Sequence, residues 1–243
     1  MAKLGAVCVS GVDRLGNPKE NQDSVLFNET NKSTILMCAD GAGSSKFGAQ
    51  GSRFLTKKIN LAFQSFETDI TLESFKEKTE CTIHQVRQIF KKYLTLKKLD
   101  LELKEFSSTL LFVFIQKNKT YLAHLGDGAA LFLDDANNVA AKSLPQNGEY
   151  ANQTYFFTNE NWRDHLRITE IDQDYSTCFI MTDGVTPFVL KKNDVFLGFI
   201  SPLVNFIKVN NFSQIEIALS NTLCSSKSLS ISTDDKSFGW YMK

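Results

Sequence analysis

Several features that would point to particular protein classes are scarce in this chain of 243 residues. It has only four prolines, and its 27 basic and 27 acidic residues leave no net charge. A balanced charge argues against nucleic-acid binding and against attachment to a membrane through a basic patch. No apolar run reaches the roughly 18 residues that suggest a membrane-spanning helix. We therefore expect neither a nucleic acid nor a membrane as a partner.

The five cysteines are odd in number, widely spread and never arranged as CxxC. That spacing does not indicate a zinc ribbon or a disulfide framework. The N-terminal sequence MAKLGAVCVSG also lacks the apolar stretch of a secretory signal. We expect five reduced, mostly buried thiols in a cytoplasmic protein.

The chain is rich in apolar residues, at 42%, and contains 20 phenylalanines. Because no repeat, low-complexity tract or Gly/Ser linker interrupts it, we predict a single domain over residues 1–243. Short apolar runs between turn-forming residues predict strands. The predicted strands cover residues 6–10, 24–27, 34–39, 108–116, 120–124, 129–133, 176–182, 228–233 and 237–242. The last two are expected to form a closing pair.

Apolar residues at helical spacing predict four helices. They cover residues 46–63, 72–94, 195–209 and 213–224. Asn118-Lys119 and Gly126-Asp127-Gly128 are expected to form two hairpin turns, and residues 134–170 an irregular surface excursion. Strands and helices come in runs rather than in alternation, which predicts an α+β fold with antiparallel sheets.

Four aspartates share a similar context, at or near a strand end beside small or polar residues. They are Asp23, Asp40, Asp183 and Asp234. One Asp-Gly at a strand end is usually only a turn, but two of these sites are Asp-Gly pairs that follow apolar strands. If the sheets bring the strand ends together, the carboxylates raise each other's pKa, and hard divalent cations relieve that cost. Oxygen ligands suit Mg²⁺ or Mn²⁺ rather than Zn²⁺.

Six short motifs then make the sequence recognisable, and they run in order along residues 16–238. They are NQDS (21–24), ADGAGSSKFGA (39–49), SSTL (107–110), AHLGDGAALF (123–132), MTDGVTPF (181–188) and STDDKSF (232–238). With these motifs the chain resembles the metal-dependent Ser/Thr phosphatases of the protein phosphatase 2C-like family. The segment GEYANQT (148–154) is similar to a stretch in a compact bacterial branch of that family.

The resemblance implies a four-layer α-β-β-α sandwich, in which helix pairs flank two antiparallel sheets, with a metal centre at one edge. By motif position, Asp40 would bridge two metal ions and Gly41 would offer its carbonyl oxygen. Asp183 and Asp234 would hold the first ion, and Asp23 would lie beside the second. Asp127 would support a third, weaker ion. The catalytic set implied is Asp40, Asp183 and Asp234.

The activity implied is hydrolysis of phospho-Ser/Thr in proteins, by direct attack of a metal-bridging hydroxide on phosphorus. Phosphoproteins would be the substrates, and a cognate Ser/Thr kinase would be a natural partner. No cysteine lies in a phosphate-cradling motif, so a cysteine phosphatase is not indicated.

Three positions depart from the family pattern. Gln22 stands where many relatives have Glu, and Ala42 where some have His. The family's phosphate-binding Arg has no clear match, because Pro18 occupies about that place with Lys19 beside it. Gln22 and the missing Arg favour an alternative, a catalytically weak or inactive binding module that recognises phosphoproteins or a kinase. A metal-dependent hydrolase of small phosphoesters or nucleotides is a third reading.

Three cations are predicted to bind substrate. Lys19 would contact phosphate as a point charge. Arg163 and Arg167, in the NWRDHLR stretch, would belong to a flap that meets the phosphopeptide, although an exposed loop is the simpler reading. His124, beside the GDG motif, is expected to pack or to orient neighbours rather than to bind metal.

Overall fold

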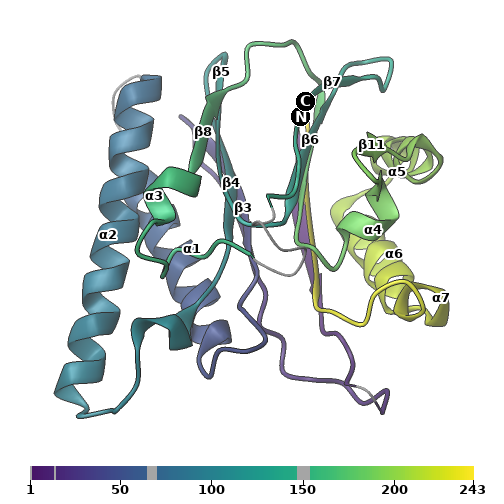
Figure 1. Ribbon diagram of the computed structural model, residues 1–243. Coiled ribbons are helices and arrows are strands. Elements are labelled where there is room, and N and C mark those ends of the chain that lie inside the picture. The colour runs from purple at the N-terminus through teal and green to yellow at the C-terminus, as the bar shows by residue number, and fades with distance from the viewer. Residues whose placement is uncertain (1, 14, 65–69, 147–153) are drawn as a thin grey trace.

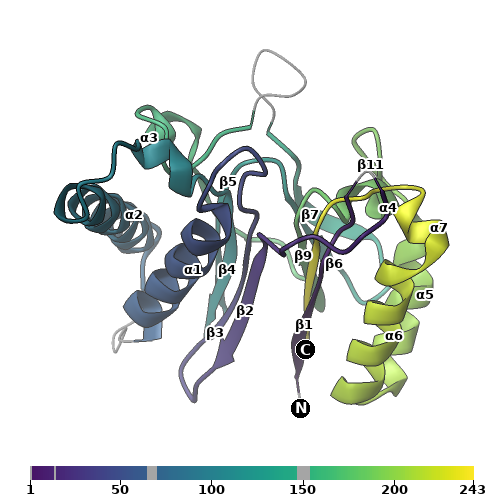
Figure 2. The same ribbon diagram turned by 90° about the horizontal axis from the view of Figure 1, so that it is seen from below.

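The computed structural model describes the chain except for residues 1, 14, 65–69 and 147–153. Most of the GEYANQT segment therefore lies outside the described residues. Two five-stranded antiparallel sheets stack face to face, and helices cover both outer faces (Figure 1). The same four layers are seen from below in Figure 2. The predicted α+β sandwich is confirmed.

The first sheet has the order β2-β3-β4-β5-β8. Its strands are β2 (Ser24–Glu29), β3 (Thr34–Ala39), β4 (Leu110–Gln116), β5 (Lys119–Leu125) and β8 (Arg167–Glu170). The second sheet has the order β1-β12-β9-β6-β7. Its strands are β1 (Lys3–Val9), β12 (Lys236–Met242), β9 (Thr177–Met181), β6 (Ala129–Leu133) and β7 (Val139–Ser143).

Two long helices, α1 (Gly48–Gln64) and α2 (Leu72–Leu96), cover the first sheet, and a 3₁₀ turn follows them at Leu103–Phe106. Thr71 caps α2, since its side chain accepts from the amide of Ser74. The second sheet is covered by α5 (Leu197–Val209) and α6 (Phe212–Cys224). The short elements are α3 (Trp162–His165), α4 (Thr186–Val189), β10 (Leu190–Lys191), β11 (Asp194–Val195) and α7 (Ser226–Leu229).

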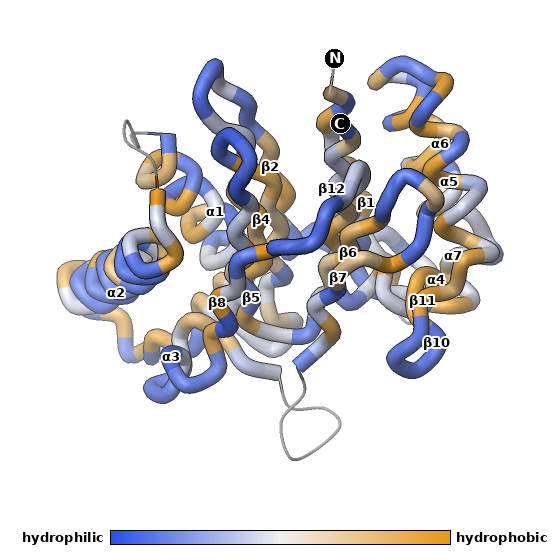
Figure 3. Tube along the Cα trace, turned by 90° about the horizontal axis from the view of Figure 1, so that it is seen from above, coloured by the Kyte–Doolittle hydropathy of each residue, from blue (hydrophilic) through white to orange (hydrophobic). Residues whose placement is uncertain are grey.

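The alternation of side chains along each strand divides the core into three layers. On the first sheet, one face packs on α1 and α2 through phenylalanines such as Phe63, Phe75 and Phe112. Leu36 and Phe132 belong to the apolar layer between the sheets. In Figure 3 hydrophilic residues gather at many chain turns and along α2. Burial of aromatic and aliphatic side chains on both faces of each sheet stabilises the sandwich.

Four predictions about local structure were wrong. Residues 228–233 form no strand: the Ser225 side chain accepts from the Ser228 amide and starts α7, and β12 pairs with β1 and β9 instead. The GDG segment is no hairpin, because it links β5 in one sheet to β6 in the other. The excursion at 134–170 contains β7, α3 and β8. The five cysteines are all free, but only Cys38 and Cys178 are buried.

Strand register brings one end of both sheets together. In the first sheet, the start of β4 pairs with the end of β5, through Leu110 and Leu125, and β3 ends beside that point. In the second sheet, Met181 at the end of β9 pairs with both Ala129 and Phe238, near the starts of β6 and β12. The loops that follow β3, β5 and β9 and precede β12 therefore meet at one edge of the sandwich.

Candidate metal centre

Asp40, Asp127 and Asp183 converge at this edge. Each contributes a carboxylate oxygen, and the three oxygens lie within 4.8 Å of one another. The three residues follow β3, β5 and β9, so they come from three distant parts of the chain and from both sheets. Carboxylates this close repel one another unless protons or cations neutralise them.

The backbone around Asp40 is fixed by the start of β4. The Asp40 amide donates to Oγ1 of Thr109 at 2.8 Å, and the Thr109 amide donates to the Asp40 carbonyl at the same distance. Gly41 donates its amide to the Gln22 carbonyl at 3.1 Å. A side chain at position 41 would collide with the Gly48 backbone, so glycine is required for this close approach.

Asp23 lies beneath the cluster and is 4% exposed. The Thr182 hydroxyl donates to its Oδ2 at 2.7 Å, whereas its buried Oδ1 has no partner among the described residues. The Oδ1 of Asp127 is likewise buried without a described partner, while its Oδ2 accepts from Thr154. Unpartnered buried carboxylate oxygens are costly, and a cation would satisfy them.

Burial and mutual repulsion raise the pKa values of this group. Burial, followed by the charges of Asp23 and Asp183, raises the pKa of Asp40 well above its usual range. Burial raises the pKa of Asp23 to about 6 and that of Asp183 to about 7, and it also raises the pKa of Asp127. Hard cations bind such oxygen donors and favour the charged form, so this group of residues fits Mg²⁺ or Mn²⁺.

A pocket of about 140 Å³ opens beside Asp40 and Asp183. Its described lining residues are Lys19, Gln22, Asp40, Gly41, Gly43, Asp183, Asp234 and Asp235. Asp234 is exposed at its rim, with 60% of its side chain accessible, and Lys19 Nζ lies 3.5 Å from Asp234 Oδ1. Of the predicted metal ligands, Asp234 is thus the outermost.

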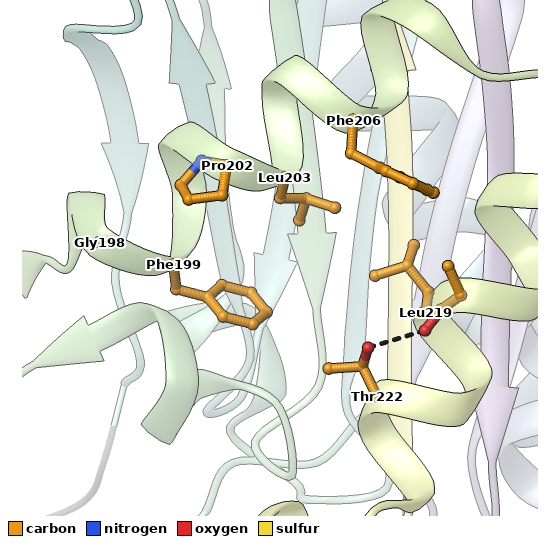
Figure 4. Close-up of a pocket in the computed structure, with 8 residues that line it drawn as sticks. Gly198, Phe199, Pro202, Leu203, Phe206, Leu219 and Thr222 are labelled. Carbon is orange, nitrogen blue, oxygen red and sulfur yellow. Dashed lines mark hydrogen bonds between the residues drawn. The ribbon is translucent and has the colours of Figure 1, made fainter.

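A larger cavity of about 410 Å³ lies between α5 and α6 (Figure 4). Its described lining residues are apolar apart from Thr222, whose hydroxyl is bonded to the Ala218 carbonyl in its own helix. This cavity therefore presents no group suited to acid–base or metal chemistry.

A family model of protein phosphatase 2C matches residues 10–223. The chain belongs to the protein phosphatase 2C family. It is 23% identical to "Serine/threonine-protein phosphatase 3" of Escherichia coli over 82% of this chain and 79% of that one. A "bacterial serine phosphatase" crystal structure matches the fold with a TM-score of 0.71 at 15% identity, over 100% of this chain and 98% of that one. The catalytic domain of PstP, solved with two manganese ions, matches with a TM-score of 0.64 at 14% identity, over 99% and 97%.

The three cationic residues predicted to bind substrate lie in different places in the structure. Lys19 lines the acidic pocket, whereas among the described residues neither Arg163 nor Arg167 does. Arg163 stacks on Trp162 and pairs with Glu80 of α2 at 3.3 Å. The Arg167 guanidinium donates to His124 Nδ1 at 2.7 Å and to the carbonyl that follows β7 at 2.6 Å. Both arginines therefore have protein partners in this structure.

His124 is completely buried. Its Nδ1 also lies 2.8 Å from the Ser143 hydroxyl. Burial, followed by the nearby charge of Arg167, holds the pKa of His124 well below its usual range. The imidazole is therefore neutral and accepts a hydrogen bond at Nδ1 from Arg167 of the neighbouring strand β8. Its contact with Ser143 joins β5 to β7 across the two sheets. This packing agrees with the supporting role predicted for it.

The motif position implies a supporting role for Asp235 rather than a ligand role, but the sequence does not reveal its partners or those of Thr182. Asp235 is 5% exposed and accepts from the amides of Gly11 at 2.7 Å and Gln22 at 2.8 Å. The Thr182 hydroxyl accepts from the Ser237 amide at 3.0 Å while it donates to Asp23. These residues lie inside the recognised motifs, but their partners are far away in the sequence. Their contacts could not be deduced from the motifs alone.

Proposed function

We propose that this protein is a Mg²⁺- or Mn²⁺-dependent phosphoprotein phosphatase that hydrolyses phospho-Ser and phospho-Thr. One observation carries the proposal: Asp40, Asp127 and Asp183 arrive from separate segments with carboxylate oxygens within 4.8 Å. Clustered carboxylates repel one another, and divalent cations relieve that repulsion while keeping the carboxylates charged. Membership of the protein phosphatase 2C family supports a phosphatase reaction at this cluster.

The proposed ligands follow the motif positions. Asp40 would bridge two ions with the Gly41 carbonyl nearby, Asp183 and Asp234 would hold the first, and Asp23 would lie beside the second. Asp127 would support a third ion. The unpartnered Oδ1 atoms of Asp23 and Asp127 support this assignment, because both are buried acceptors.

The bound cations would supply the chemistry by acidifying a water molecule and by neutralising charge on the phosphoryl oxygens. The protein's own residues orient the reaction. Two bonds to Thr109 fix the backbone of Asp40, and the Thr182 hydroxyl orients the Asp23 carboxylate. Lys19 at the pocket rim is the proposed phosphate contact. Arg163 and Arg167 stay predictions as substrate contacts.

The size of the pocket favours a phosphoprotein over a nucleotide. Typical small-molecule sites have volumes of roughly 300–1,000 Å³. The acidic pocket has about 140 Å³, which suits a phosphoryl group whose carrier stays outside. A Ser/Thr kinase that makes the phosphoprotein is the proposed partner, and the cytoplasm is the proposed location. Among the residues that the structure describes, no helix is long and apolar enough to cross a membrane.

Gln22 supports a second candidate function, that of a binding module for phosphoproteins. Gln22 lines the pocket but brings no charge, and Lys19 is paired with Asp234. A site with weak cation binding could recognise phosphoproteins without hydrolysing them. Such a module would bind a phosphothreonine peptide and release no phosphate.

The test measures phosphate release from a phosphothreonine peptide, p-nitrophenyl phosphate and a nucleotide, with Mn²⁺, Mg²⁺ or EDTA. We expect metal-dependent turnover that is fastest on the peptide. Peptide binding without turnover would establish the binding module instead. Faster release from the nucleotide would indicate a small-molecule hydrolase.

A further inference from the structure

Lys236 is a fully buried lysine at the start of β12, two residues after the proposed ligand Asp234. Lysine is rarely buried completely unless its ammonium group has a specific partner. The Lys236 Nζ donates to the backbone carbonyl of Asp234 at 2.9 Å. This bond closes a tight loop that contains Asp234 and Asp235.

The stem of Lys236 also reaches the second metal-binding loop. Its Cγ would lie 3.2 Å from a methyl group placed on Gly184, the residue after Asp183. The same methyl group would collide with the carbonyl oxygen of Asp235. Lys236 therefore lies behind the point where the Asp183 and Asp234 loops touch.

The other contacts of this region leave Asp234 with little support. Asp235 is held by the amides of Gly11 and Gln22. The Asp234 side chain is 60% exposed, and its partner is Lys19, whose Nζ lies 3.5 Å from Oδ1. The Asp234 amide bonds to the Ser232 hydroxyl at 3.2 Å, within the same loop. Among the described residues, Lys236 makes the hydrogen bond that ties the Asp234 carbonyl to β12.

We propose that Lys236 is a positioning residue that holds Asp234 in place for metal binding. The inference rests on the proposed metal centre. Lys236 would act through the hydrogen bond from its ammonium group to the Asp234 carbonyl. Among the described residues, no carboxylate lies within ion-pair distance of Lys236. Loss of a residue that orients a metal ligand typically lowers metal affinity about 10- to 100-fold.

The charge and the hydrogen bond of Lys236 predict opposite results when the lysine is removed. A buried positive charge near carboxylates repels divalent cations, so its loss alone would tighten metal binding. Loss of the hydrogen bond frees the Asp234 loop and weakens binding. The direction of the change in metal affinity therefore identifies which effect dominates.

The experiment compares Mn²⁺ binding by calorimetry for the wild type, Lys236→Met and Lys3→Met. Lys3 is the matched control because its Nζ also donates to backbone carbonyls, of Ile207, Lys208 and Asn210 at 2.7–2.8 Å, but at the end of α5. We expect Lys236→Met to weaken the binding of one Mn²⁺ about tenfold or more. Lys3→Met should lower the melting temperature and leave Mn²⁺ affinity unchanged.

A second comparison measures the effect of Lys236→Met in a protein that already carries Asp234→Asn. If Lys236 acts through Asp234, adding Lys236→Met to Asp234→Asn should change Mn²⁺ affinity less than twofold. If Lys236→Met does not fold, Lys236→Gln replaces it, since the shorter amide cannot reach the Asp234 carbonyl. Unchanged or tighter Mn²⁺ binding in the folded variant would overturn the inference. Absence of Mn²⁺ binding by the wild type would instead overturn the proposed metal centre.

Discussion

At the level of single residues, the acidic pocket holds more negative than positive charge. Asp40, Asp183 and Asp234 line it, and Lys19 is the cation on its described rim. Lys19 is one-third exposed on its side chain, so its ammonium group can turn from Asp234 toward an incoming phosphate. A lysine used in this way contributes mainly to substrate binding.

Replacement of Lys19 by methionine tests that role. We expect Lys19→Met to raise the KM for a phosphothreonine peptide about tenfold, the size of a charge-assisted hydrogen bond, with kcat changed less than threefold. Lys32→Met, on an exposed turn between β2 and β3, is the control and should match the wild type. A fall in kcat at unchanged KM would show that Lys19 acts in the chemical step instead.

The sequence was informative about these residues to different degrees. Asp40, Asp127 and Asp183 were identified because each lies in a recognisable motif, and the structure brings all three together. Asp23 was identified in the same way and is buried beneath them. Lys236 could not be found from a pattern, because its role depends on complete burial and on one backbone carbonyl. Such a contact exists only in the folded chain.

At the level of elements, one buried arginine attaches the segment after residue 154 to α2. Arg87 is 5% exposed and donates to the carbonyls of Phe157 at 2.8 Å and Asn159 at 2.7 Å. It also pairs with Glu160 at 2.9 Å. The anchored segment begins close to Thr154, which bonds to Asp127. Arg87 thus links the helix layer to the region of the proposed metal centre.

Arg87→Met should destabilise the protein strongly. The substitution leaves two carbonyl groups without a donor, and each such loss costs about 1–3 kcal/mol. We expect urea denaturation to show a free energy of unfolding lower by about 3 kcal/mol. Arg163→Met removes an exposed ion pair with Glu80 and should cost less than about 1 kcal/mol. Equal stabilities of the two variants would refute the anchoring role of Arg87.

The elements themselves were predicted well where periodicity is strong. The two long helices on the first sheet and the strand at Thr34–Ala39 follow the predicted positions closely. The failure at residues 228–233 has a local cause. The Ser225 side chain and backbone bonds that span three or four residues satisfy polar groups of this segment, so they are not available to a neighbouring strand. The GDG segment failed for a topological reason, since a short turn between strands does not reveal whether they share a sheet.

At the level of the whole molecule, the buried carboxylates couple stability to pH. The usual pKa of 3.8 rises to about 6 for Asp23 and to about 7 for Asp183, first because of burial. Between about pH 4 and 7 the folded protein therefore binds more protons than the unfolded chain. Because the free energy of unfolding falls with pH wherever the folded state holds more protons, metal-free protein loses stability across this window.

We expect metal-free wild type in EDTA to lose stability between pH 5.5 and 8 relative to Asp183→Asn. Only the interval between pH 5.5 and the folded pKa of about 7 contributes, so the difference should be on the order of 2 kcal/mol, at about 1.4 kcal/mol per pH unit. The comparison with Asp183→Asn is needed because the neutral, buried His124 has the opposite pH dependence. Thermal melts at pH 5.5 and pH 8 measure this difference in stability between the two proteins. A pH dependence identical in the two proteins would contradict the assignment.

Divalent cations should restore the stability that the metal-free protein loses at pH 8. Mn²⁺ or Mg²⁺ binds only the folded arrangement of Asp40, Asp127 and Asp183, so saturating metal adds about 2.7 kcal/mol at 100 times the dissociation constant. We expect the melting temperature at pH 8 to rise with Mn²⁺ and to rise little at pH 5.5, where protons compete for the carboxylates. Equal shifts at both pH values would contradict this competition.

The central claim is that distant aspartates form one centre that binds divalent cations and hydrolyses phosphoproteins. Its most direct test combines Mn²⁺ calorimetry with phosphothreonine-peptide hydrolysis for the wild type and the Asp40→Asn/Asp183→Asn variant. Asp135→Asn, an exposed aspartate beyond β6, is the control. We predict that the double variant stays folded and loses both Mn²⁺ binding and turnover by about 100-fold or more, whereas Asp135→Asn retains both. Full turnover in the double variant would contradict the account.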